Sequence, residues 1–115
     1  MPSQFVRFEH DHAATVGTVL TPKFTEREAP ILTDEISQAA QEGDWRVVLD
    51  LSEVTMLSSA GLGSLLTIHK ACKKGGGRCV LFGLDKTIHG TLKITKLDSV
   101  FTIKKSREDA LKLFG

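Results

Sequence analysis

The chain has 115 residues, with 15 Lys and Arg against 14 Asp and Glu, and 41% hydrophobic residues. This length fits one domain with its own core, and the composition is typical of a soluble globular protein. The balanced charge disfavours a nucleic-acid binder. No apolar run approaches the roughly 20 residues that cross a bilayer, and the N-terminus lacks the pattern of a signal peptide. We therefore predict that residues 1–115 form one cytoplasmic domain.

The first half of the chain predicts two strands, a helix and a third strand. Residues 4–10 and 14–20 form two apolar-rich segments across a short polar break, which indicates a hairpin. Pro30 suits the first turn of a helix that ends at Gly43. Residues 46–52 are rich in Val and Leu, as in a strand covered on both faces. The helix is expected to face the core through Ile31, Leu32, Ile36, Ala39 and Ala40.

The second half predicts three helices that alternate with two strands. The first helix begins after Ser58 and Ser59 and ends at the glycines 75–77, and its inward positions are Leu62, Leu65, Leu66, His69 and Cys72. Residues 78–84 predict a buried strand. Residues 86–95 predict a weaker helix with Ile88, Leu92 and Thr95 inward. A short strand follows at 101–104, and Ser106 with Asp109 forms a capping box for the last helix.

The predicted order is therefore β-β-α-β-α-β-α-β-α. Alternating strands and helices indicate an α/β fold, here a mostly parallel sheet of about five strands with about four helices. The core is expected to include Val47, Val48, Leu49, Leu65, Leu66, Val80 and Leu81.

Three explanations fit the serine pair between a buried strand and an apolar helix. A serine hydroxyl caps the first turn of many helices. A nucleophile is the second explanation, but the hydrolase turn Gly-x-Ser-x-Gly has Met56 in place of its first glycine, and the histidines show no ordered pattern that would supply a base. A phosphate acceptor is the third, because a helix N-terminus tolerates an anion.

The remaining polar groups do not predict a catalytic or metal site. His10 and His12 lie one residue apart without a third ligand at useful spacing, so we expect exposed strand polarity there. His69 is expected to be half-buried and hydrogen-bonded. Cys72 and Cys79 are expected to be small buried groups in a reducing compartment. No paired carboxylates or ordered triad appear, so the sequence predicts neither a cofactor nor an enzyme.

The segment VVLDLSEVTMLSSAGLGSLL resembles the central signature of the STAS domain (sulfate transporter and anti-sigma factor antagonist). The segment GGGRCVLFGLDKTIHGTLKITKLDSVFTIKKSREDAL is similar to the second half of that domain. The resemblance runs from about Arg46 to the C-terminus, and before Arg46 only the order of elements agrees. The short chain points to the anti-sigma factor antagonists, and the resemblance implies a single STAS domain over residues 1–115.

The resemblance implies a protein-interaction module in which Ser58 is the phosphoacceptor. The unphosphorylated domain binds an anti-sigma factor that is also a serine protein kinase, and so releases a sigma factor. Phosphorylation breaks that complex, and a phosphatase restores it. The expected partner-binding residues are Leu57, Ser58, Ser59, Ala60, Gly61 and Leu62.

The sequence departs from the family pattern close to the acceptor. Leu57 stands where the family has an aspartate, and Ala60 where it has a glycine. The acidic turn that the family carries after the second strand is replaced by LTPKFTERE. The alternative function is an accessory STAS subunit of a transporter or a larger signalling assembly, which is never phosphorylated.

Overall fold

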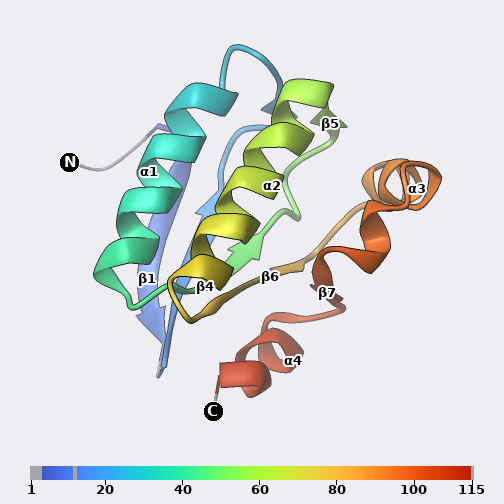
Figure 1. Ribbon diagram of the computed structural model, residues 1–115. Coiled ribbons are helices and arrows are strands. Elements are labelled where there is room, and N and C mark those ends of the chain that lie inside the picture. Colours follow the sequence, from blue (N-terminus) through green and yellow to red (C-terminus); the bar gives the residue numbers. More distant parts are fainter. Residues whose placement is uncertain (1–3, 12, 115) are drawn as a thin grey trace.

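Five strands form the central sheet, in the order β1-β2-β4-β6-β7 (Figure 1). The computed structural model describes residues 4–11 and 13–114. The first two strands form the antiparallel hairpin that the sequence predicts, and the remaining pairs are parallel. The strands are β1 (Val6–Asp11), β2 (Ala14–Val19), β4 (Arg46–Asp50), β6 (Arg78–Phe82) and β7 (Thr102–Lys104).

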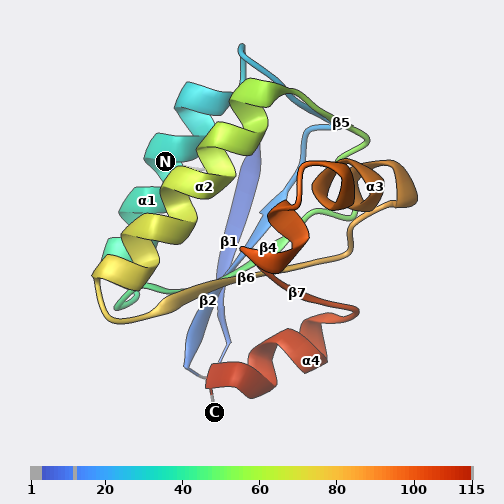
Figure 2. The ribbon, with the colours of Figure 1, turned by 45° about the vertical axis from the view of Figure 1, so that its right-hand side comes forward.

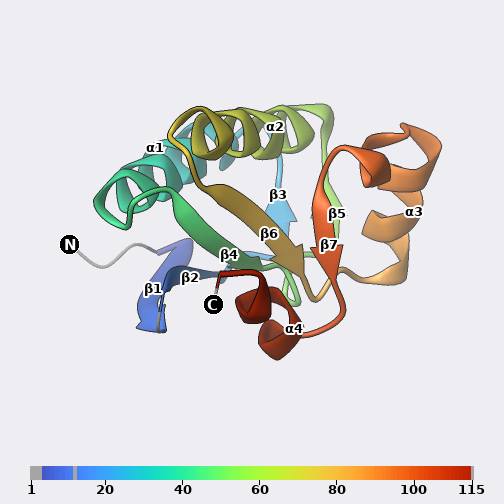
Figure 3. The same cartoon turned by 60° about the horizontal axis from the view of Figure 1, so that its bottom comes forward.

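The helices lie on both faces of this sheet. Figure 3 shows α1 and α2 side by side over one face and α4 against the other, while Figure 2 shows α3 beside β7, at the sheet edge away from β1. The predicted fold class is thereby confirmed. The helices are α1 (Ala29–Glu42), α2 (Ser59–Lys74), α3 (Lys86–Ile94) and α4 (Arg107–Leu111), with short 3₁₀ turns η1 (Leu97–Ser99) and η2 (Lys112–Phe114).

Two further strands, β3 (Lys23–Phe24) and β5 (Met56–Leu57), pair in parallel as a separate ribbon. The sequence analysis missed both strands. Each has two residues, which is too short to show the alternation by which a strand is recognised. The pairing exists because the chain before α1 and the chain before α2 lie next to each other in the folded protein.

The central strands are covered on both faces, as the sequence predicts. Alternate residues of β4 point to opposite sides, so that Val47 and Leu49 pack under α1 and α2 whereas Val48 packs with Val16 and Val80 on the side of α4. Every predicted core residue is buried except Leu66, which is half-buried at the margin of the larger cluster. Cys72 and Cys79 are buried free cysteines, as expected.

Two predicted inward positions, Ile31 and Thr95, are wrong. Ile31 is 45% exposed, because the buried side of α1 follows a spacing of four, through Leu32, Ile36 and Ala40, and leaves Ile31 about 100° away. Thr95 is exposed at the end of α3, where its hydroxyl donates back to the carbonyl of Thr91.

The histidines require a second correction. His69 is half-buried against the ring of Phe101, but its Nδ1 is buried without the hydrogen-bond partner that we expected. Burial, and then the charges of Lys73 and Lys70, lower the pKa of His69 below its ordinary value. His10 is exposed on β1, and His12 lies outside the described residues.

Among residues 4–11 and 13–114, no helix combines the length and apolarity that crossing a membrane requires.

An ion pair connects α4 to the opposite edge of the sheet. The Arg107 guanidinium donates to Glu9 Oε1 at 2.6 Å and to Asp11 Oδ2 at 3.1 Å, both on β1. The hydrogen bond and the charge of Arg107 hold the pKa of Glu9 below its ordinary value of 4.5. Ser106 Oγ accepts the N–H of Asp109, which confirms the predicted cap of α4.

The ion pair of Arg107 with Glu9 and Asp11, here called the clamp, predicts a pH-dependent contribution to the free energy of unfolding. Because the pKa of Glu9 is lowered in the folded chain, the contribution is complete above pH 4.5 and disappears as the pH falls through the lowered pKa. Urea unfolding of the wild type and of Arg107→Gln should differ more at pH 7 than at pH 3. Lys112→Gln, whose ion-pair distance to Asp109 is 3.9 Å, is the matched control. Equal differences at both pH values would contradict the clamp.

Candidate functional site

The serine pair lies at the N-terminus of α2. Ser58 has extended backbone angles and is the N-cap, and its Oγ accepts the N–H of Gly61 at 3.2 Å. Its carbonyl accepts the N–H of Leu62 at 2.9 Å, which is the first hydrogen bond of the helix. The capping explanation of the sequence is therefore confirmed, and Ser58 provides the cap.

The ribbon of β3 and β5 positions this turn. The Ser58 N–H donates to the carbonyl of Phe24 at 3.1 Å. Two residues earlier, the N–H of Met56 donates to the carbonyl of Pro22 at 3.0 Å. The strand before the turn is thus held by the backbone that precedes α1, even though more than 30 residues separate the two segments.

Gly61 lies directly against the same backbone. A Cβ at this position would lie 2.2 Å from the carbonyl oxygen of Phe24 and 2.7 Å from Leu57 Cδ1. In contrast, a Cβ at Gly63 would have no heavy atom within 4 Å. Sequence reasoning missed Phe24, although a glycine inside an apolar helix is a signal of close backbone approach.

A hydroxyl pair joins the two helices near the site. Ser64 on α2 is buried and shares a short hydrogen bond with Thr33 on α1. Ser64 Oγ also lies 3.5 Å from the carbonyl of Ala29. These contacts join α1 and α2 within two turns of their N-termini, close to the serine turn.

The residues predicted to bind a partner differ in their access to solvent. Ser59, the first residue of α2, is exposed, whereas Gly61 is buried and acts through its small size. Next to them, the large apolar side chain of Met56 is 52% exposed. The remaining four are half-buried: Leu57, Ser58, Ala60 and Leu62.

The electrostatics of the turn suit an added anion. The first turn of α2 contains no acidic side chain, and its last turn carries Lys73 and Lys74. The positive, N-terminal end of the α2 dipole is therefore not neutralised by a carboxylate in the first turn. Within residues 4–11 and 13–114, no three His, Cys, Asp or Glu side chains are grouped so that they could hold a metal ion.

Comparison with known proteins agrees with this architecture. The STAS domain family model matches residues 22–110. "Putative anti-sigma factor antagonist BtrV" of Bordetella bronchiseptica is 34% identical over 83 residues, which cover 72% of each chain. The chain therefore belongs to the STAS domain family.

Solved structures share the fold at low sequence identity. An anti-sigma factor antagonist from Mycobacterium paratuberculosis superposes with a TM-score of 0.83 at 22% identity, over 99% of this chain and 98% of that one. The Bacillus cell fate determinant SpoIIAA, solved in its phosphorylated form, gives 0.68 at 16% identity, over 93% and 96%.

The two glycines of the turn provide a matched test of this geometry. Gly61→Ala should lower the free energy of unfolding by about 1–3 kcal/mol, because its Cβ meets the rigid Phe24 carbonyl. Gly63→Ala should raise it by about 0.5–1 kcal/mol, because alanine loses less entropy than glycine in an open helical position. Chemical denaturation measures both. Equal effects of the two substitutions would refute the close approach at Gly61.

Proposed function

We propose that this chain is an anti-sigma factor antagonist that works as a phosphorylation-switched interaction module. In its unphosphorylated form it binds an anti-sigma factor that is also a serine protein kinase, and it thereby releases a sigma factor in the cytoplasm. A phosphatase restores the unphosphorylated form. The observation that carries the proposal is a serine pair at a capped helix N-terminus, in a chain related to an anti-sigma factor antagonist.

The binding surface of this proposal combines the serine pair with apolar side chains. Met56 lies in β5, immediately before the turn, and Ile31 lies in the first turn of α1. Both are large, exposed and apolar, and the N-terminal ends of α1 and α2 lie at the same end of the helix pair (Figure 1). We expect a partner that covers this end of the helix pair to remove both from water.

A phosphate on this turn would change binding far more than folding. It adds about 1.5 to 2 negative charges at a helix N-terminus, where free N–H groups and the helix dipole favour an anion. A partner packed over the turn must remove this charge from water without a prepared counter-ion. An unpaired buried charge costs about 3–5 kcal/mol, or two to three orders of magnitude in affinity.

The family resemblance implies that Ser58 is the phosphoacceptor. Ser58 and Ser59 differ in exposure and in their role in capping α2, so the test must show which of them carries the phosphate. Ser58 is half-buried, and its oxygen caps α2 by accepting from Gly61. Ser59 is exposed one residue later. A kinase therefore reaches Ser59 with less local rearrangement, whereas phosphate on Ser58 would keep an acceptor at the capping position.

Substitutions at the two serines test the switch. Ser58→Asp should melt near the wild type, because aspartate is also a good N-cap, but should bind the kinase about 100- to 1,000-fold more weakly. Ser58→Ala should bind constitutively while losing about 1 kcal/mol of helix capping. Affinity is measured by calorimetry, and mass spectrometry locates the phosphate after incubation with kinase and ATP.

Ser59→Ala is the control, because it leaves the cap intact and should still be phosphorylated. Phosphate on Ser59 alone would move the acceptor by one residue and leave the rest of the proposal standing. Wild-type affinity in Ser58→Asp, together with a chain that the kinase never modifies, would favour the accessory subunit of a transporter or signalling assembly instead.

We also propose that the domain catalyses no reaction by itself. What supports this proposal is that Ser58 Oγ accepts the backbone N–H of Gly61, as a helix cap does. Purified wild type should therefore show no esterase or nucleotidase turnover above that of Ser58→Ala. Turnover that disappears on this substitution would make Ser58 a nucleophile.

A further inference from the structure

Positive charge is concentrated in α3 and in the chain that connects it to α4. Residues 86–105 contain five lysines and one aspartate, which is a net charge of +4 in a chain whose overall charge is +1. Lys104 and Lys105 end this segment, and neither has an ion-pair partner among residues 4–11 and 13–114. Acidic residues lie at both ends of the segment: Asp85 is the N-cap of α3, and Glu108 and Asp109 are in the first turn of α4.

The same segment exposes large aliphatic side chains. Ile94, the last residue of α3, is 84% exposed, and Val100, just after η1, is 43% exposed. A single exposed aliphatic residue is common on protein surfaces. Here Ile94 precedes η1 and Val100 follows it, and Asp98 of η1 and Phe101, the residue after Val100, line a cavity.

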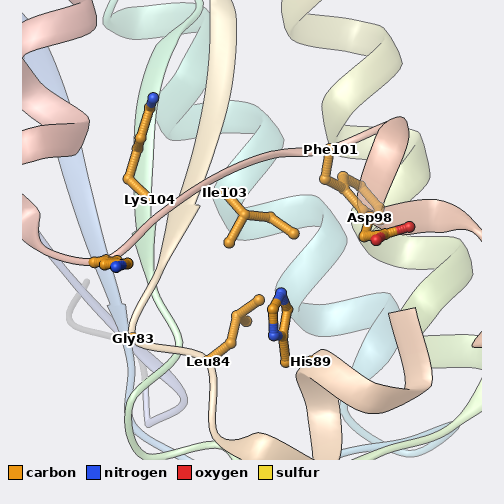
Figure 4. A pocket seen from close by; sticks show the side chains of 8 residues that line it. Gly83, Leu84, His89, Asp98, Phe101, Ile103 and Lys104 are labelled. Atoms are coloured by element: carbon orange, nitrogen blue, oxygen red, sulfur yellow. The ribbon is translucent and has the colours of Figure 1, made fainter. Parts of the chain in front are cut away.

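This cavity, of about 610 Å³, lies between α3 and β7. Figure 4 shows Leu84, His89 and Ile103 converging on it from the loop after β6, from α3 and from β7, with Phe101 and Asp98 on the side of η1. Its volume lies within the range of sites that bury a bulky side chain or a small ligand. Lys104 and Lys105 also line it.

We propose that these features form a second docking surface, the α3–β7 surface, which binds an acidic peptide segment that inserts one bulky apolar side chain. The surface consists of the cavity, Ile94, Val100, Lys104 and Lys105. The lysines provide charge complementarity to the acidic residues of the segment. The cavity receives the apolar side chain, and Ile94 and Val100 pack along the peptide on either side of η1.

A peptide fits this surface better than other anionic partners. A small molecule would fill the cavity but leave Ile94 exposed. A nucleic acid is bound through aromatic stacking platforms in addition to cations, and the aromatic residue of this cavity, Phe101, is only 5% exposed. An anionic membrane would engage the lysines without needing a cavity. The proposal uses none of the residues of the serine turn, so it stands or falls independently of the switch.

Selection from a phage-displayed library of random 12-residue peptides tests the proposal on the full chain. Peptides enriched on the wild type should be rich in Asp and Glu and contain a bulky apolar residue. They should be lost on the variant Ile94→Ser/Lys104→Gln/Lys105→Gln. A selected peptide should bind Ile94→Ser alone about tenfold more weakly, as expected for the loss of one buried aliphatic side chain.

The controls separate folding, general charge and other partners. Ile94→Ser changes an exposed side chain, so circular dichroism should show an unchanged fold. Lys73→Gln/Lys74→Gln removes two exposed lysines elsewhere on the chain and should bind the selected peptide within twofold of the wild type. Selected peptides that are not acidic, or that bind the triple variant equally well, would overturn the proposal. The proposal would also be overturned if no acidic peptide is selected and the wild type, but not the triple variant, binds phosphatidylserine vesicles or a single-stranded DNA 20-mer.

Discussion

The close approach of α2 to the backbone of Phe24 is the constraint on which the arrangement of the serine turn depends. One carbonyl oxygen accepts the N–H of Ser58 and leaves no room for a side chain at Gly61. The helix N-terminus is therefore seated on the segment before α1, rather than projecting freely from β5. The turn keeps its shape because moving it would break backbone hydrogen bonds and separate two packed helices.

Because the turn is held by these backbone contacts, we expect a charge on it to change the affinity for a partner without unfolding the domain. The turn lies outside the central sheet, whose two apolar layers are packed beneath α1 and α2 on one face and α4 on the other. Helix N-terminal N–H groups stabilise an anion locally. A modification there changes the surface that a partner meets, while the core that holds the helices remains as it was.

The two proposed binding surfaces differ in their exposed chemical groups. The first combines the hydroxyls of the serine turn with the exposed Met56 and Ile31. The α3–β7 surface combines a cavity lined by Lys104 and Lys105 with the exposed Ile94 and Val100. The two surfaces belong to different elements and differ in charge.

The sequence by itself determined the fold class, the order of the long elements and the cap at Ser58, because these depend on local hydrophobic periodicity, capping residues and a family signature. Tertiary structure alone decided the pairing of β3 with β5, the role of the Phe24 carbonyl, the exposure of Ile31 and the unpaired Nδ1 of His69. Each of these depends on contacts between segments distant along the chain, and two-residue strands or one position on a helix carry too little local pattern to reveal them. The same holds for the cavity beside β7, since its walls come from a loop, a helix, a 3₁₀ turn and a strand that only folding brings together.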